Sequence, residues 1–400
     1  MTPKYLRPML VLVGLGLIAA PFTAAAVDKK YSTGASDTEI KVGHSVAYSG
    51  PASAFGATGR TLSAYFRMLN EAGGISGRKI NFMSLDDAYS PAKALEQTRK
   101  LVEGDGVLLM SGVTGTPTNS ATQKYLNSKG VPQILLSTGA TKFNNPKDFP
   151  WTMAFWPSYD LEQKIFADYI LKTRPGARIA VLYANDDFGK THLNGLKAAL
   201  AGKSGASIVA EAAYETSDPT IDSQIVALKA SGADVFVNAS TPKFTAQAIR
   251  RAHEIGWAPL QFVVNASSSI SAVLKPAGLE NAVGAITTGF IKAPDDPVWA
   301  KDKDVRDYLD FMKTWNPQDN PFDFFAAAGY LNAQMLRHVL ESCGDDLTRE
   351  NIMKHVANIH DVHLPMQLPH IVLKTTPDDF GIYKSLQLQR FDGKNWVDID

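Results

Sequence analysis

The feature that most constrains the fold of this chain is a regular alternation of short apolar strands with amphipathic helices. Repeated strand–helix units predict parallel sheets with helices on both faces. The carboxyl ends of parallel strands meet at one edge of such a sheet, which is where open α/β sheets bind ligands. The first series has strands at 39–47, 79–85, 107–110 and 133–136, with helices at 55–72, 91–103 and 117–128.

A second series follows a break near Trp151–Ser158, and 400 residues are too many for a single core. It starts with a helix at 159–172. Strands follow at 178–183, 207–213, 235–238 and 261–264, with helices at 188–200, 220–231 and 244–255. We therefore expect an α/β fold of two Rossmann-like lobes in tandem.

The end of the chain indicates that the two lobes exchange segments. Residues 298–357 read as mostly helical, and late strands are expected at 371–373 and 385–391. Crossings through 285–291 and about 377–384 would then form a multi-strand hinge. The expected boundaries are 37–155 plus 291–380 for the first lobe and 156–290 plus 381–400 for the second. Such a hinge places a ligand in the cleft between the lobes.

Residues 1–26 have the pattern of a cleaved signal peptide. Lys4 and Arg7 form a positive region, Met9–Ala20 is an apolar run, and Ala24–Ala26 offers small residues before the cut. An uncleaved N-terminal anchor is the alternative. The absence of a cysteine at the cut argues against a lipid anchor. We expect an exported protein, which in a bacterium means a periplasmic one.

Composition and motifs exclude several classes of protein. Lys and Arg total 40 and Asp and Glu total 40, which argues against a nucleic-acid partner. The single cysteine, Cys343, rules out an internal disulfide and is expected in a buried helix. The chain has neither a P-loop nor a G-x-S-x-G motif, so we expect no cofactor.

Two polar clusters offer weaker catalytic or metal-binding alternatives. His360 and His363 are candidate metal ligands, but a solvated loop is the preferred interpretation, and we expect no metal. Asp86 and Asp87 end a strand and are a candidate catalytic pair, with turn acceptors as the alternative. An exported enzyme using either cluster is the least favoured function.

The stretch 111–118 (SGVTGTPT) directly follows a buried strand. We expect Thr116 to be the N-cap of the next helix and Pro117 its first residue. Thr114, Gly115 and Thr116 would then present N–H groups and hydroxyls to an anion. An ordinary capped turn is the alternative.

The next strand ends in a similar way, at residues 137–141 (STGAT). Ala140 and Thr141 would complete a grip for a carboxylate that uses uncharged donors, unless the segment is a plain polar loop. Aromatic residues lie at other strand ends and at the break. Tyr48, Phe55, Trp156 and Phe188 are the candidate ligand contacts among them, with packing in the core as the alternative.

An ordered set of motifs resembles one family. It comprises residues 39–43 (EIKVG), 49–51 (SGP), 70–78 (NEAGGISGR), 86–88 (DDA), 137–141 (STGAT) and 187–189 (DFG). This set is similar to the branched-chain amino-acid type of periplasmic substrate-binding protein of ABC transporters, over nearly the whole mature chain. The resemblance implies a bilobed fold with three crossovers. It also implies a carboxylate held by Thr114–Thr116, Ala140 and Thr141.

The sequence departs from that family where amino-acid ligands are held by their ammonium group. The family's acidic residue falls in segment 265–271 (NASSSIS), around Ala266, and the segment contains no acid. Asp295 or Asp323 is a possible substitute. Phe188 replaces the usual tyrosine, and Tyr89 and Thr114 fall about where leucine-binding members have cysteines.

These departures favour a different ligand from that of the amino-acid receptors. Burying an ammonium group without a counter-charge costs several kcal/mol. We expect the ligand to be a small carboxylic acid, aromatic rather than an α-amino acid. The chain would be a monomeric, non-enzymatic receptor of an ABC importer. It would deliver the ligand by docking on permease subunits in the inner membrane. A branched-chain amino-acid receptor and a periplasmic amide or urea sensor are the alternatives.

Overall fold

The structure is a computed structural model that describes residues 1, 3 and 29–399. The expected signal peptide at residues 1–26 falls almost entirely outside these residues and stays a prediction. Within the described part of the chain, no helix has the length and apolar character needed to span a membrane.

The first lobe is built on a five-stranded sheet in the order β3–β2–β4–β5–β6, with every neighbouring pair parallel. Apolar side chains such as Ile40, Val42 and Ile134 are fully buried in it. The strands are β2 (Glu39–Val46), β3 (Lys79–Asp86), β4 (Leu109–Ser111), β5 (Gln133–Leu136) and β6 (Thr152–Ala154).

The second lobe is built on a seven-stranded sheet in the order β14–β13–β11–β10–β9–β7–β8. The five strands β7 to β11 pair in parallel with their neighbours. Strands β13 and β14 extend the sheet at the β11 side as an antiparallel edge. The strands are β7 (Ala177–Ala184), β8 (Ala206–Tyr214), β9 (Val235–Ala239), β10 (Leu260–Val263), β11 (Ile286–Gly289), β13 (Gln387–Phe391) and β14 (Trp396–Asp398).

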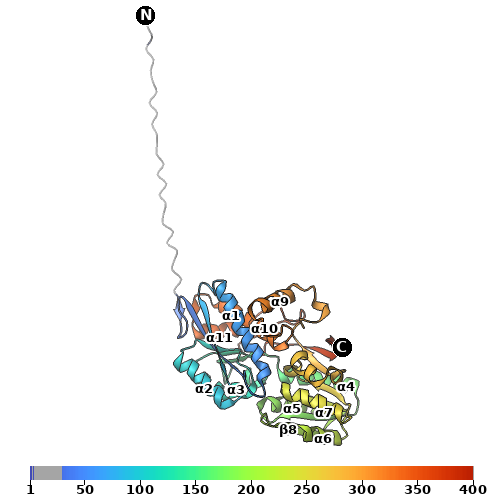
Figure 1. Cartoon of the computed structure of the whole chain (residues 1–400). Coiled ribbons are helices and arrows are strands. Elements are labelled where there is room, and N and C mark those ends of the chain that lie inside the picture. The colour runs from blue at the N-terminus through green and yellow to red at the C-terminus, as the bar shows by residue number, and fades with distance from the viewer. Residues whose placement is uncertain (2, 4–28, 400) are drawn as a thin grey trace.

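Helices cover both faces of each sheet, so the molecule has two α/β bodies side by side (Figure 1). In the first lobe α1 packs against α10 and α2 against α3; in the second, α4 packs against α5 and α6 against α7. The helices are α1 (Gly56–Glu71), α2 (Pro91–Arg99), α3 (Thr116–Ser128), α4 (Tyr159–Thr173), α5 (Asp187–Leu200), α6 (Asp222–Ala230), α7 (Pro242–Glu254), α8 (Lys275–Ala277), α9 (Lys303–Trp315), α10 (Phe324–Cys343) and α11 (Arg349–Val356).

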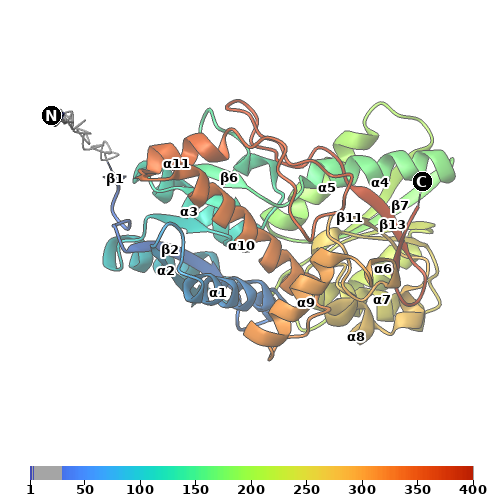
Figure 2. The same ribbon diagram turned by 90° about the horizontal axis from the view of Figure 1, so that it is seen from above.

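The late helices show that the chain crosses between the lobes more than once. Figure 2 shows α10 lying along the first lobe beside α1 and α11, although it follows all the parallel strands of the second lobe in sequence. The chain leaves the first sheet after β6, leaves the second after β11, and returns to the second at β13. This gives the three passages that the resemblance implies.

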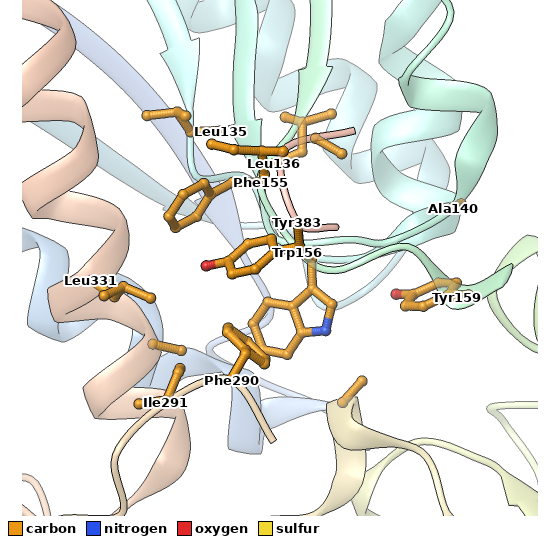
Figure 3. Packing of buried hydrophobic residues seen from close by; sticks show 14 of the residues in the cluster. Leu135, Leu136, Ala140, Phe155, Trp156, Tyr159, Phe290, Ile291, Leu331 and Tyr383 are labelled. Atoms are coloured by element: carbon orange, nitrogen blue, oxygen red, sulfur yellow. The ribbon is translucent and has the colours of Figure 1, made fainter. Parts of the chain in front are cut away.

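Aromatic side chains pack together where the chain passes between the lobes (Figure 3). The ring centroids of Trp156 and Phe290 are 5.2 Å apart, those of Phe290 and Tyr383 are 5.2 Å apart, and those of Phe155 and Tyr383 are 5.7 Å apart. Phe155 and Trp156 belong to the first passage, Phe290 to the second and Tyr383 to the third. The cluster therefore packs the three passages against one another.

The structure differs from the sequence predictions in some short elements. The strand expected at Ile371–Leu373 is absent, and Leu373 forms only isolated bridges to Val362 and Tyr383. The helix expected at 91–103 ends at Arg99 and continues as a π-helical turn, Lys100–Gly104. A small parallel pair, β1 (Lys30–Tyr31) with β12 (Asp346–Leu347), was not predicted, because two-residue strands carry no periodic signal.

Candidate functional site

A small cavity lies between the lobes, at the carboxyl ends of strands from both sheets. Its volume is about 20 Å³. Seven of the ten predicted site residues line it: Phe55, Thr114, Gly115, Thr116, Trp156, Phe188 and Ala266. The other lining residues are Thr58, Tyr89, Ser137, Tyr159 and Phe325.

The first lobe supplies the polar wall, built around the start of α3. The prediction that Thr116 caps this helix was wrong, because Gly115 is the N-cap and Thr116 the first helical residue. The Thr116 hydroxyl instead bonds to the hydroxyl of Thr138 at 2.7 Å. Gly115 and Thr116, at the start of α3, both line the cavity. The first N–H groups of a helix lack partners within it and carry a partial positive charge.

Gly115 is the residue that lets the chain turn into this wall. Its φ is +111°, a conformation that residues with a side chain rarely adopt. A Cβ at this position would lie 2.7 Å from the ring of Tyr89 and 2.8 Å from the hydroxyl of Thr118. The close approach of the turn to the Tyr89 ring therefore depends on glycine.

Tyr89 is held against the cavity by the carboxylate pair at the end of β3. The Asp87 carboxylate accepts hydrogen bonds from the Tyr89 N–H at 2.9 Å and from the Ser45 hydroxyl at 2.8 Å. Burial raises the pKa of Asp87 to about 6. Asp86 accepts bonds from the backbone of Tyr48 and the side chain of Lys93. Both carboxylates thus serve as turn acceptors.

The second lobe supplies an aromatic wall through a buried network. The indole N–H of Trp156 donates to the side-chain oxygen of Asn265 at 2.7 Å. The Asn265 backbone N–H and the Thr288 hydroxyl both donate to Oε1 of Glu162 at 2.8 Å. This network fixes the turn that carries Ala266 into the cavity.

Phe188 and Tyr159 are packed on a buried histidine of α5. The ring of His192 stacks on Tyr159 with centroids 4.0 Å apart and meets Phe188 edge-on at 4.9 Å. Phe188 thus contacts both its own lobe and the cavity. Burial lowers the pKa of His192 to about 3, so its imidazole is neutral at ordinary pH.

Three predicted site residues lie outside the cavity lining. Tyr48 bonds through its hydroxyl to Ser84 at 2.6 Å, and Ala140 is fully buried. The exposed Thr141 donates its hydroxyl to Asp160 of the second lobe. Thr141 therefore joins the lobes at the edge of the cleft, beside a second contact in which Asp187 accepts bonds from Ser120 at 2.7 Å and from Lys142 at 2.5 Å.

The lining lacks a charged side chain among the described residues. Asp323 instead caps α10, accepting from the Phe325 N–H at 2.8 Å, and Asp295 lines a different cavity. Asp186 caps α5 through the N–H groups of Phe188 and Gly189. Asp295 and Asp323, the two carboxylates considered as substitutes for the family's acid, thus lie outside this cavity lining.

A larger cavity of about 410 Å³ adjoins the aromatic wall on its far side. Phe324 lines it and packs on Trp156, with ring centroids 5.8 Å apart. It includes Trp299, Trp396 and the ion-paired Lys292, but none of the strand-end hydroxyls predicted to grip a carboxylate. The smaller cavity is therefore the candidate ligand site.

Across residues 29–399, His, Cys, Asp and Glu side chains form no group of three placed to hold a metal ion. Cys343 is buried at the end of α10, as predicted, and burial raises its pKa to about 12.

Thr58 and Phe325 of the lining and Glu162 behind it were not predicted from the sequence. Phe325 follows a helix cap in a region read only as helical, so no pattern pointed to the cleft. Glu162 lies in the first turn of α4, where acids commonly complement the helix dipole. Its full burial depends on the turn after β10 and on β11 itself, which are remote in sequence.

Comparisons with known proteins agree with this architecture. The family described as periplasmic binding protein matches residues 39–379. A Leu/Ile/Val-binding protein homologue of Brucella melitensis is 23% identical over 308 residues, covering 76% of this chain and 80% of its own.

Two solved structures share the fold. A branched-chain amino-acid ABC transporter protein from Thermus thermophilus with bound valine has a TM-score of 0.82 and 15% identity, covering 91% of this chain and 96% of its own. A fatty-acid ABC transporter substrate-binding protein from Thermomonospora curvata has a TM-score of 0.76 and 20% identity, covering 92% and 94%. The predicted type I periplasmic binding protein fold is thereby confirmed, and the chain belongs to the periplasmic binding protein family, whose members are substrate-binding receptors of the periplasm.

Proposed function

We propose that this chain is the solute receptor of an ABC importer and captures a small carboxylic acid with an aromatic body and no α-ammonium group. The observation that carries the proposal is the composition of the interlobe cavity. The first lobe contributes Thr58, Thr114, Thr116, Ser137 and the start of α3 together with the rings of Phe55, Tyr89 and Phe325. The second lobe contributes three further aromatic rings, and the described lining has no charged side chain. This arrangement suits an anion that needs donors and an apolar body.

An α-amino acid is disfavoured by the same lining. Its ammonium group would be buried without a carboxylate partner, at a cost of several kcal/mol. Because each 1.4 kcal/mol is a factor of ten in affinity, the penalty amounts to orders of magnitude.

Capture would require motion about the hinge. A cavity of about 20 Å³ has room for about one water molecule, far less than an aromatic acid. We infer that the lobes separate at the Thr141–Asp160 and Lys142–Asp187 contacts and close again on the ligand. The boundaries proposed for these bodies are 37–155 plus 291–380 and 156–290 plus 381–400.

A branched-chain amino acid is the second candidate. It is favoured by the names of the relatives, which include Leu/Ile/Val-binding protein homologues, and by the valine-bound structure. The proposal also includes cleavage after Ala26, a monomeric receptor without catalytic activity, and docking on inner-membrane permease subunits.

A thermal-unfolding panel tests the choice of ligand. Benzoate, 3-phenylpropionate, 4-methylpentanoate, leucine and valine would each be added to the mature chain. A ligand present at 100 times its Kd adds about 2.7 kcal/mol of stability. We expect stabilisation by an aromatic acid and little by leucine or valine; the reverse order would replace the proposal with the second candidate.

A further inference from the structure

Glu162 is a fully buried carboxyl group directly behind the aromatic wall of the cavity. Its Oε1 accepts two hydrogen bonds, from the Asn265 N–H and the Thr288 hydroxyl, while Oε2 has no hydrogen-bond partner among the described residues. A buried carboxyl group with one oxygen unsatisfied is costly as an anion and much less so as a neutral acid.

All four lining residues of the second lobe connect to this group. Asn265 accepts from Trp156 and precedes Ala266 in the chain. Tyr159 lies one turn before Glu162 on α4 and stacks on His192, which also meets Phe188. The Nδ1 atom of His192 is 3.7 Å from Oε2 of Glu162. Glu162 thus holds the turn that carries Ala266, lies one turn from Tyr159, and is next to the histidine that packs on Phe188.

The groups that face Glu162 leave its charge uncompensated. From α5 the facing group is His192, whose Nδ1 lies 3.0 Å from the side-chain nitrogen of Gln163. An amide nitrogen only donates, so Nδ1 accepts and the imidazole is neutral. Asn265, in the turn after β10, and Thr288, in β11, also face Glu162, and neither side chain titrates. On α4 itself Tyr159 is neutral, since burial raises the pKa of its phenol.

Burial raises the pKa of Glu162 to about 8, against the hydrogen bonds from Asn265 and Thr288, which lower it. The group is therefore a neutral acid at pH 7 and an anion above pH 8. An anion behind the cavity would repel a carboxylate ligand inside it, and in a low-dielectric interior the repulsion is strong.

We propose that Glu162 is a positioning residue that holds the second lobe's half of the ligand site, and that loss of its proton weakens the capture of an anionic ligand. This inference rests on the proposed function and adds to it a control of affinity by pH.

The first test is the affinity for 3-phenylpropionate between pH 7 and 9, measured by calorimetry. If only the protonated form binds, the affinity of the natural chain falls about tenfold over this range. Glu162→Gln keeps an oxygen for Asn265 and Thr288 and cannot ionise, so its affinity should stay constant. Glu254→Gln, on the exposed face of α7, is the matched control and should follow the natural chain. A pH-independent affinity in the natural chain, or an unchanged fall in Glu162→Gln, would overturn the inference.

A second test needs no ligand and separates this inference from the proposed function. A raised pKa in the folded state means that folding retains a proton that the unfolded chain releases, so the carboxyl group costs stability as pH rises from its usual 4.5 to about 8. The neutral His192 has the opposite effect only below pH 6.5. Between pH 6.5 and 8, the folded-to-unfolded ratio should therefore fall by up to tenfold per pH unit relative to Glu162→Gln. Parallel curves would show that folded Glu162 does not retain its proton between pH 6.5 and 8 and would refute the proposal, whichever ligand binds.

Discussion

The two lobes contribute opposite chemistry to one cavity. The first lobe places Ser and Thr hydroxyls and a helix N-terminus at the ends of β4 and β5, although Phe55, Tyr89 and Phe325 also belong to it. The second lobe contributes Trp156, Tyr159, Phe188 and Ala266, and its polar atoms are engaged behind the wall with Asn265 and Glu162. Under the proposed function, the first lobe would bind the charged group of the ligand and the second lobe would contact its apolar body.

The difference follows from how each wall is built. In the first lobe the donors belong to turns that follow buried strands, so the backbone itself faces the cavity. In the second lobe the corresponding turn, Asn265–Ser267, is held by a carboxyl group beneath it. The same strand-end position therefore presents polar groups in one lobe and apolar ones in the other.

The largest effect is expected from breaking the polar half. Thr116→Val removes a hydroxyl of nearly the same shape. A hydrogen bond to a charged group contributes about 1.5–3 kcal/mol, so the affinity for an aromatic carboxylate should fall about 10- to 150-fold. Thr141→Val is the control, because Thr141 lies outside the lining and contacts Asp160. Calorimetry on both variants, with unfolding measured in parallel, checks this. Equal losses would mean that Thr141 also holds ligand, as the family resemblance implies.

A smaller and more selective effect is expected from the aromatic half. Phe188→Leu keeps an apolar side chain but removes the ring, and aromatic pairs add about 0.5–1.5 kcal/mol beyond burial. Affinity for 3-phenylpropionate should fall about two- to tenfold, while 4-methylpentanoate should be affected less. Because Phe188 also meets His192 and Tyr159, the unfolding midpoint must be compared. The same loss for both acids would indicate that Phe188 only supports its own lobe.

The smallest effect is expected where the lobes touch outside the cavity. Asp187→Asn weakens the contact with Lys142, a half-exposed pair with side-chain exposures of 47% and 43%. Exposed ion pairs contribute about 0.2–1 kcal/mol and are screened by salt. Affinity should fall by up to about fivefold at low salt and less at high salt, as read from titrations at two ionic strengths. A larger, salt-independent loss would place Asp187 in the ligand site itself.

Sequence predicted the polar half of the site better than its supporting structure. Thr114, Gly115 and Thr116 line the cavity, and they were predicted because glycine and hydroxyls after a buried strand are a local signal. The assignment of Thr116 as N-cap failed because its hydroxyl has a better partner in Thr138, which lies 22 residues away. A tertiary hydrogen bond of this kind overrides the local preference of threonine for the N-cap position. The sequence alone does not show which side chains at neighbouring strand ends will form hydrogen bonds.

The long elements were predicted closely and the short ones were not. α1, α4 and α5 match their expected ranges within about two residues, since each has a clear helical period and clear end signals. Residues 371–373 are apolar enough to read as a strand, but they pack by side chain rather than by a strand ladder. The burial of Glu162 could not be predicted for a related reason, because tertiary packing decides whether an acidic residue in the first turn of a helix is buried.

The most direct test of the central claim compares two ligands that differ by a single ammonium group. Phenylalanine is 3-phenylpropionate with an α-amino group, so the pair isolates the half of the site that lacks an acid. Calorimetry at pH 7 should show 3-phenylpropionate binding at least about 100-fold more tightly, because the buried ammonium costs several kcal/mol without a counter-charge. Tighter binding of phenylalanine would contradict the account, since it would require a carboxylate facing the cavity.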